Sequence, residues 1–216
     1  MIDSDLKQQV ERALDWEPSV DAEDIGVAVA DGVVTLRGNV ASYAAKLMAE
    51  RAVLRVYGTK AVANDLIVHV AGVYERTDTQ IAQAAVTALT WHTNVPDDKV
   101  TVAVKDGWIA LAGTVDWQYQ KDAANGAVHD LTGVKGVTND IRVQPRVKSA
   151  DVRAKIQAAF TRSAEMDARR VSVTASDGTV VLSGNVRSWA ERQEAERAAW
   201  AAPGVRQVDD RITIVP

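Results

Sequence analysis

The side chains that could do chemistry in this chain are few and scattered. Cysteine is absent, which excludes disulfides, thiolate nucleophiles and cysteine-bound metals. The three histidines, His69, His92 and His129, form no H-x-x-x-H or similar metal-binding pair. No G-x-S-x-G motif and no phosphate-holding glycine loop occurs. We therefore expect no catalysis, no cofactor and no metal.

Acidic and amide side chains do recur, but their surroundings suit backbone turns better than a reaction. Three aspartates precede a glycine in a pair typical of a tight type I′ hairpin turn, namely Asp31, Asp106 and Asp177. Three further side chains recur beside a predicted strand, namely Asn64, Asn139 and Asp210. We expect these to accept main-chain hydrogen bonds, and a ligand role is the alternative.

Tryptophan and arginine indicate a binding surface rather than a reaction. The chain has six tryptophans, and Trp189 and Trp200 lie together off the core-facing stripe of a helix expected near 189–202. An earlier expected helix, near 43–56, carries apolar side chains on the equivalent off-core stripe. The candidate lipid- or partner-binding residues are Trp189, Arg192, Arg197 and Trp200 on the later helix, and Tyr43, Leu47 and Leu54 on the earlier one.

Two interpretations of this off-core stripe remain open. Burial between repeats or between chains is the favoured one, and a membrane or partner surface is the alternative. Tryptophan with arginine suits a helix at a lipid headgroup layer. Three glutamates on the same helix could pair with the arginines and weaken such binding, namely Glu191, Glu194 and Glu196.

Charge and hydropathy narrow the classes of partner. The chain of 216 residues has a net charge of −4, which argues against sequence-independent binding of nucleic acid. Residues 1–74 hold 7 basic and 11 acidic side chains, whereas residues 148–216 hold 11 and 9. No apolar run is long enough to span a membrane, and the acidic start does not look like a secretory leader. We expect a cytoplasmic protein able to associate with a membrane surface, or a periplasmic one if a leader has been removed.

The elements that position these residues occur three times. The segment Asp31–Val40 has copies at 106–115 and 177–186, and each hairpin glycine is followed 26 residues later by another glycine. All length variation falls in two linkers, near 69–78 and 144–150. The repeated glycines, all expected to serve backbone turns, are Gly32, Gly38, Gly58, Gly107, Gly113, Gly133, Gly178, Gly184 and Gly204.

Each repeat predicts the order α-β-β-α-β. Apolar residues at helical spacing follow a capping-type residue, which we expect to be the N-cap: Asp3, Asp78 or Ser149. Two alternating strands flank the Asp-Gly turn, and the next glycine, at 38, 113 or 184, is expected to end the second strand at a close backbone approach. A second helix ends at the glycine at 58, 133 or 204. The last strand is expected at about 60–68, 135–143 and 206–214.

These motifs resemble the BON domain family, named for bacterial osmotically inducible and nodulation proteins. The shared pattern is D-G-x-[VI]-x-L-x-G-x-V, a helix, then G-V-x-x-V-x-[ND]-x-[LI]. The resemblance implies α+β architecture: three tandem domains over 1–70, 76–145 and 148–216, each a small three-stranded sheet with two helices on one face. It also implies a non-enzymatic module linked to stress, envelope integrity and binding of anionic phospholipid or protein partners.

The expected function is peripheral binding of anionic phospholipid or an envelope component in an osmotic stress response. The expected contact is the third repeat, through Trp189, Trp200 and Arg192. Two alternatives stay open: a protein-interaction or chaperone-like module, and a structural oligomer in which the apolar stripes are buried between chains.

Overall fold

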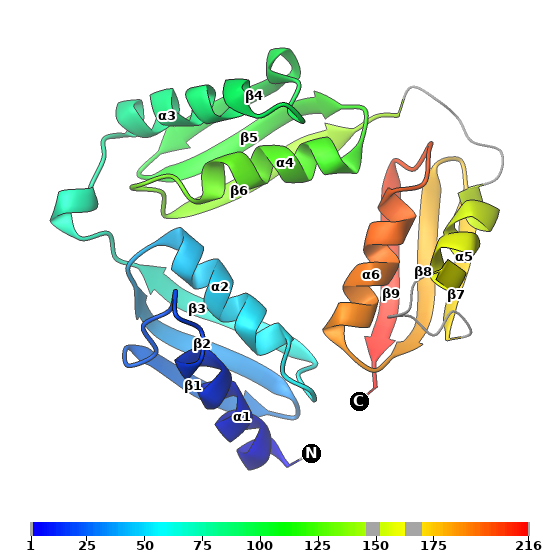
Figure 1. Cartoon of the computed structure of the whole chain (residues 1–216), viewed down its shortest axis with the longest axis horizontal. Helices are drawn as coiled ribbons and strands as arrows, with labels where there is room; N and C mark the ends of the chain where they lie inside the picture. The colour runs from blue at the N-terminus through cyan, green and yellow to red at the C-terminus, as the bar shows by residue number, and fades with distance from the viewer. Residues whose placement is uncertain (1, 146–151, 163–169, 216) are drawn as a thin grey trace. The chain divides into compact units, whose positions relative to one another are not determined.

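A computed structural model describes residues 2–145, 152–162 and 170–215. It contains three successive α+β repeats, each an antiparallel hairpin and a third strand covered by helices (Figure 1). The first repeat comprises α1 (Asp3–Asp15), β1 (Ile25–Ala30), β2 (Val33–Val40), α2 (Tyr43–Leu54) and β3 (Ala61–Val68). The second comprises α3 (Asp78–Trp91), β4 (Val100–Lys105), β5 (Trp108–Val115), α4 (Gln118–His129) and β6 (Gly136–Val143). The third comprises α5 (Val152–Arg162), β7 (Val171–Ser176), β8 (Thr179–Val186), α6 (Trp189–Trp200) and β9 (Gln207–Ile214).

Each repeat has its own three-stranded sheet, with the strands in sequence order and the second strand in the middle. In the first and third repeats the hairpin pair is antiparallel and the last strand runs parallel to the middle one. The second helix makes the crossover that a parallel connection needs. Each last strand begins one residue after the predicted start.

The core of each repeat lies between the sheet and its helices. In the first repeat the stripe Leu6, Val10 and Leu14 of α1 packs with Val34 and Leu36 of β2. The equivalent α5 stripe of the third repeat packs in the same way, and it comprises Val152, Ile156 and Phe160. Alanines on α2 and α6 are buried, so that the second helix of each of these repeats lies close to its sheet. The prediction of an α+β fold with two helices on one face of each sheet is confirmed.

Two of the three predicted N-caps, Asp3 and Asp78, are wrong. Helix α1 has Ile2 at its N-cap position with no side-chain hydrogen bond, and α3 has Thr77, which forms a capping box with Gln80. Asp3 and Asp78 are the first helical residues instead, and their carboxylates bond elsewhere, to the hairpin turn of their own repeat. The third predicted cap, Ser149, lies outside the described residues.

The repeated glycines all have positive φ. The hairpin glycines lie where expected, but the glycines of the second strands and those after the second helices do not. Gly38, Gly113 and Gly184 lie inside the middle strands rather than at their ends, at φ +132°, +141° and +127°. A side chain at Gly38 would overlap the carbonyl oxygen of Asp24 on the neighbouring segment, which is the close approach that was predicted.

The glycines after the second helices do not end those helices. Helix α2 ends at Leu54, and Gly58 follows in a separate turn closed by the bond from Thr59 N–H to the Val56 carbonyl at 3.2 Å. A positive φ at the third position of such a turn is the type II arrangement, which favours glycine. Short 3₁₀ segments occur at Gly72–Tyr74 and Asp97–Lys99.

Candidate functional site

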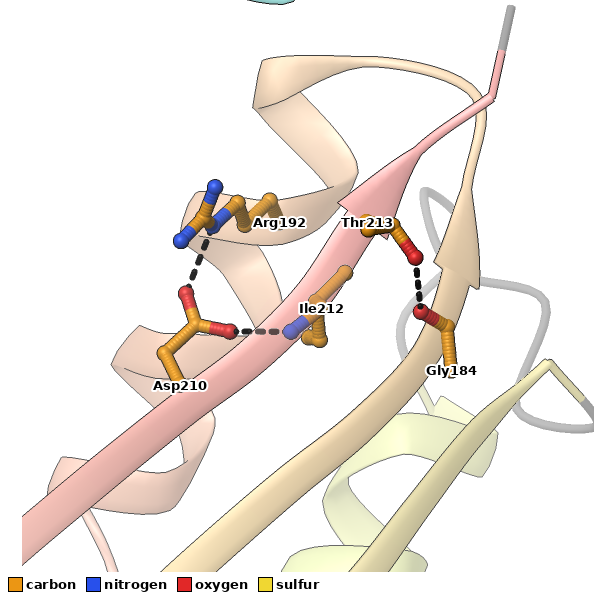
Figure 2. Close-up of polar contacts among 5 residues, drawn as sticks. All are labelled: Gly184, Arg192, Asp210, Ile212 and Thr213. Atoms are coloured by element: carbon orange, nitrogen blue, oxygen red, sulfur yellow. Dashed lines mark hydrogen bonds and ion pairs between the residues drawn. The ribbon is translucent and has the colours of Figure 1, made fainter.

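The centre of the predicted surface is Arg192 on α6, which is held by two neighbours. Its Nε donates a hydrogen bond to Oδ2 of Asp210 on β9 at 2.7 Å, and the side chains are only 26% and 14% exposed (Figure 2). Its guanidinium carbon lies 4.9 Å from the ring centroid of Trp189, a cation–π contact. The other Asp210 oxygen accepts from the main-chain N–H of Ile212 at 2.9 Å. The positive charge of Arg192 is therefore largely neutralised by contacts within its own repeat.

The second helix and the last strand of the first repeat are also joined by equivalent side chains, but these do not form an ion pair with each other. Asn64, equivalent to Asp210, donates to the carbonyl of Lys46 and to Glu50 at 3.2 and 2.9 Å. Lys46, equivalent to Arg192, donates to the Leu66 carbonyl at 2.7 Å. The contact is part of the scaffold, and in the third repeat the two equivalent side chains, Arg192 and Asp210, form an ion pair with each other.

The recurring Asx side chains do what the sequence predicted, since each accepts from the main-chain N–H two residues further on. The distances are 3.4 Å for Asn64, 3.2 Å for Asn139 and 2.9 Å for Asp210. Such bonds satisfy a strand backbone beside the helix.

The placement of Trp200 away from the core is wrong. Trp200, the last residue of α6, is half-buried and packs on the core cluster of its repeat. Trp189, at the other end of α6, is half-buried too, and its indole N–H is buried with no hydrogen-bond partner among the described residues. The binding role of the two rings remains a prediction.

The other cation of α6, Arg197, is also balanced by an acid, and charged side chains near the helix are engaged in the same way. Arg197 is exposed and forms an ion pair with Glu194. The Glu191 carboxylate accepts from the main-chain N–H of Arg187 at 2.9 Å. On β9, the hydrogen bonds that Arg211 donates to the Asp209 carboxylate raise the pKa of Arg211. The glutamates thus weaken the positive charge of this helix, as the sequence suggested.

The apolar residues predicted on α2 are not exposed. Tyr43, Leu47 and Leu54 are all half-buried, and burial raises the pKa of the Tyr43 phenol. The binding role of these three side chains remains a prediction.

A concentration of positive charge that the sequence reasoning missed lies on α5. Between Val152 and Arg162 this helix has no acidic residue and three exposed cations, Arg153, Lys155 and Arg162. Helix α6 packs beside it on the same face of the sheet (Figure 1). The signal that could have found it is the uninterrupted basic composition of this one helix.

Two exposed tryptophans were also missed. Trp16 directly follows the last residue of α1, and Trp91 is the last residue of α3. The two are 75 residues apart, which is the offset between the first two repeats. Their side chains are 89% and 82% exposed. The repeat offset alone would have identified them as one recurring surface feature.

Across the described ranges, no three histidine, aspartate or glutamate side chains are placed to hold a metal ion. Within the same part of the chain, no helix is long and apolar enough to cross a membrane.

The fold, repeated three times with its turn glycines, defines a tandem-repeat α+β protein. A model of the BON domain matches residues 2–69, 77–145 and 148–216. The chain belongs to the BON domain family.

Two further comparisons place the chain among known proteins. It is 33% identical over 150 residues to osmotically-inducible protein Y of Escherichia coli (strain K12), covering 67% of this chain and 74% of that protein. One solved structure of CdsD, a structural protein of the type III secretion system of Chlamydia trachomatis, aligns over 98% of this chain and 93% of its own at 16% identity and a TM-score of 0.28. The C-terminal domain of CdsD aligns over 100% of both chains at 15% identity and a TM-score of 0.27. These two scores are too low to support an argument.

Proposed function

We propose that this protein is a non-catalytic binding module of an osmotic stress response, and that it attaches to anionic phospholipid through the helix layer of its third repeat. The name of the E. coli relative, osmotically-inducible protein Y, supports the link to osmotic stress. The observation that carries the lipid proposal is helix α5, with three exposed cations and no acid between Val152 and Arg162.

The charge of the three first helices favours this repeat over the others. Helix α1 carries four acids and two cations, and the one charged residue of α3 is Asp78, whose carboxylate is used by the hairpin turn. An anionic surface therefore attracts α5 and repels α1. Trp189 and Arg197, on the adjacent α6, are the predicted residues that add to this layer.

The expected attachment is weak and reversible. Each cation near an anionic leaflet contributes about 1 kcal/mol, so three contribute roughly 3 kcal/mol. That is less than the ~4.1 kcal/mol of a millimolar dissociation constant, so additional contacts or several bound copies must supply the rest. Such binding weakens steeply with salt because the Debye length falls from about 10 Å at 0.1 M to about 3 Å at 1 M.

Vesicle sedimentation tests the proposal with the full chain at dilute protein. Vesicles of phosphatidylglycerol mixed with phosphatidylcholine should carry down the protein at low salt, and vesicles of phosphatidylcholine alone should not. The variant Arg153→Glu with Arg162→Glu should lose binding. The matched control Lys105→Glu with Arg142→Glu changes the same charge on exposed strand residues of the second repeat and should keep it.

Two results overturn the proposal. One is equal binding to neutral vesicles, which would indicate an apolar or protein-type surface. The other is equal binding by the α5 variant and by the original chain at low salt. Circular dichroism of each variant shows that it has folded.

A further inference from the structure

The first helices of the first and third repeats occupy equivalent positions in the fold but carry opposite charge. Helix α1 holds four carboxylates and two cations among its thirteen residues. One of those cations, Lys7, pairs with Glu11 at 3.7 Å on the same helix. Helix α5 holds three cations and no acid among its eleven residues. Apart from Asp3, whose carboxylate binds the hairpin turn, the charged side chains of both helices are exposed.

The acidic side of α1 also presents an aromatic ring. Trp16, 89% exposed, follows the last residue of α1 and stands between Asp15 and Glu17 in the chain. An exposed indole beside carboxylates suits a guanidinium or ammonium group, which binds the ring face and the acid together. The position equivalent to Trp16 in the third repeat is Arg162, an exposed guanidinium.

We propose that the α1 surface of one copy of this protein, comprising Asp5, Asp15 and Trp16, binds the α5 helix of a second copy. The acidic charge of this surface repels lipid phosphate and nucleic acid and favours a cationic partner. The chain itself supplies such a partner on a helix of similar length, 11 residues against 13.

This contact joins different surfaces of the two copies. It leaves α5 of the first copy and α1 of the second unoccupied, so further copies add head to tail. The contact rests on exposed charges, and the self-association is therefore weak, dependent on protein concentration and sensitive to salt. It does not depend on lipid binding.

The test measures the mass of the full chain in solution without lipid, by sedimentation equilibrium or light scattering. At low salt the average mass should rise with protein concentration, and it should return to that of one chain near 0.5 M salt. The variant Asp5→Lys with Asp15→Lys should stay monomeric. The variant Arg153→Glu with Arg162→Glu should stay monomeric too, and the control Lys105→Glu with Arg142→Glu should still associate.

The decisive arm mixes the two monomeric variants. The first has a basic α1 and the second an acidic α5, so an equimolar mixture should associate again although neither variant does so alone. Three results overturn the proposal. The first is a monomeric mass of the original chain at every concentration. The second is association that either charge reversal leaves unchanged, and the third is a mixture of the two variants that stays monomeric. Because no lipid is present, these results are independent of the vesicle experiment.

Discussion

Asp3, the first residue of α1, holds the hairpin turn at Gly32, which lies 29 residues further along the chain. Its two carboxylate oxygens accept hydrogen bonds from the main-chain N–H groups of Asp31 and Gly32 at 2.9 and 3.2 Å. Asp78 makes the same pair of bonds to Asp106 and Gly107 at 2.8 and 2.9 Å. One side chain thus fixes where the first helix begins relative to the turn of the sheet it covers.

Removing this carboxylate should destabilise the first repeat. Asp3→Ala leaves two main-chain N–H groups without their acceptor, and we expect the free energy of unfolding to fall by about 1–3 kcal/mol. Asp3→Asn keeps one acceptor oxygen and should lose less. Urea unfolding followed by circular dichroism measures the change. Ser4→Ala, an exposed neighbour on the same turn of helix, is the control, and an equal effect of the two alanine variants would contradict the assignment.

The Arg192–Asp210 pair should be replaceable by the chemistry of the first repeat. Arg192→Lys or Asp210→Asn alone disrupts a partly buried ionic hydrogen bond, and each should cost roughly 1.5–3 kcal/mol. Combined, the two changes place in the third repeat the residue types that the first has at Lys46 and Asn64, and the double variant should recover much of that loss. Urea unfolding of the four proteins gives the coupling free energy. Purely additive effects would show that the two side chains do not interact in solution.

Two glycine-to-alanine changes should act in opposite directions. Gly38 has φ +132° and no room for a side chain against the Asp24 carbonyl, so Gly38→Ala should destabilise by about 2–4 kcal/mol. Gly126 lies inside helix α4 with nothing within 4 Å of an added Cβ, and Gly126→Ala should stabilise by about 0.5–1 kcal/mol. Thermal unfolding compares the two variants. A tolerated Gly38→Ala would mean that the neighbouring segment can move away.

Tryptophan fluorescence should report the two exposed rings. Replacing both Trp16 and Trp91 by phenylalanine removes the most exposed indoles of the described chain. The emission of the remaining four should move to shorter wavelength, and quenching by acrylamide should decrease. The matched pair Trp189→Phe with Trp200→Phe removes half-buried rings and should move the emission the other way. Identical spectra for the two double variants would contradict the exposures described above.

Much of the architecture was accessible from the sequence because it depends on local patterns. Apolar spacing predicts the helices and the hairpin strands of each repeat. The last strands begin one residue after their predicted starts. The Asp-Gly pairs adopt positive φ at both residues, since the turn itself requires that backbone conformation. The structural role of Asn64, Asn139 and Asp210 also follows from local sequence, because each accepts a hydrogen bond from the main-chain N–H two residues further on.

The tertiary structure decided which distant groups each side chain meets. In the sequence Asp3 looks like an N-cap. In the structure its carboxylate instead accepts hydrogen bonds from two main-chain N–H groups of the hairpin turn, 28 and 29 residues away. Arg192 looked available for lipid phosphate until folding brought Asp210, 18 residues away, against it. On an ideal helical wheel Trp200 lies off the core-facing stripe, whereas in the structure it packs on the core cluster at the end of α6. Contacts between segments far apart in the chain depend on how elements pack, and helical periodicity carries no information about that packing.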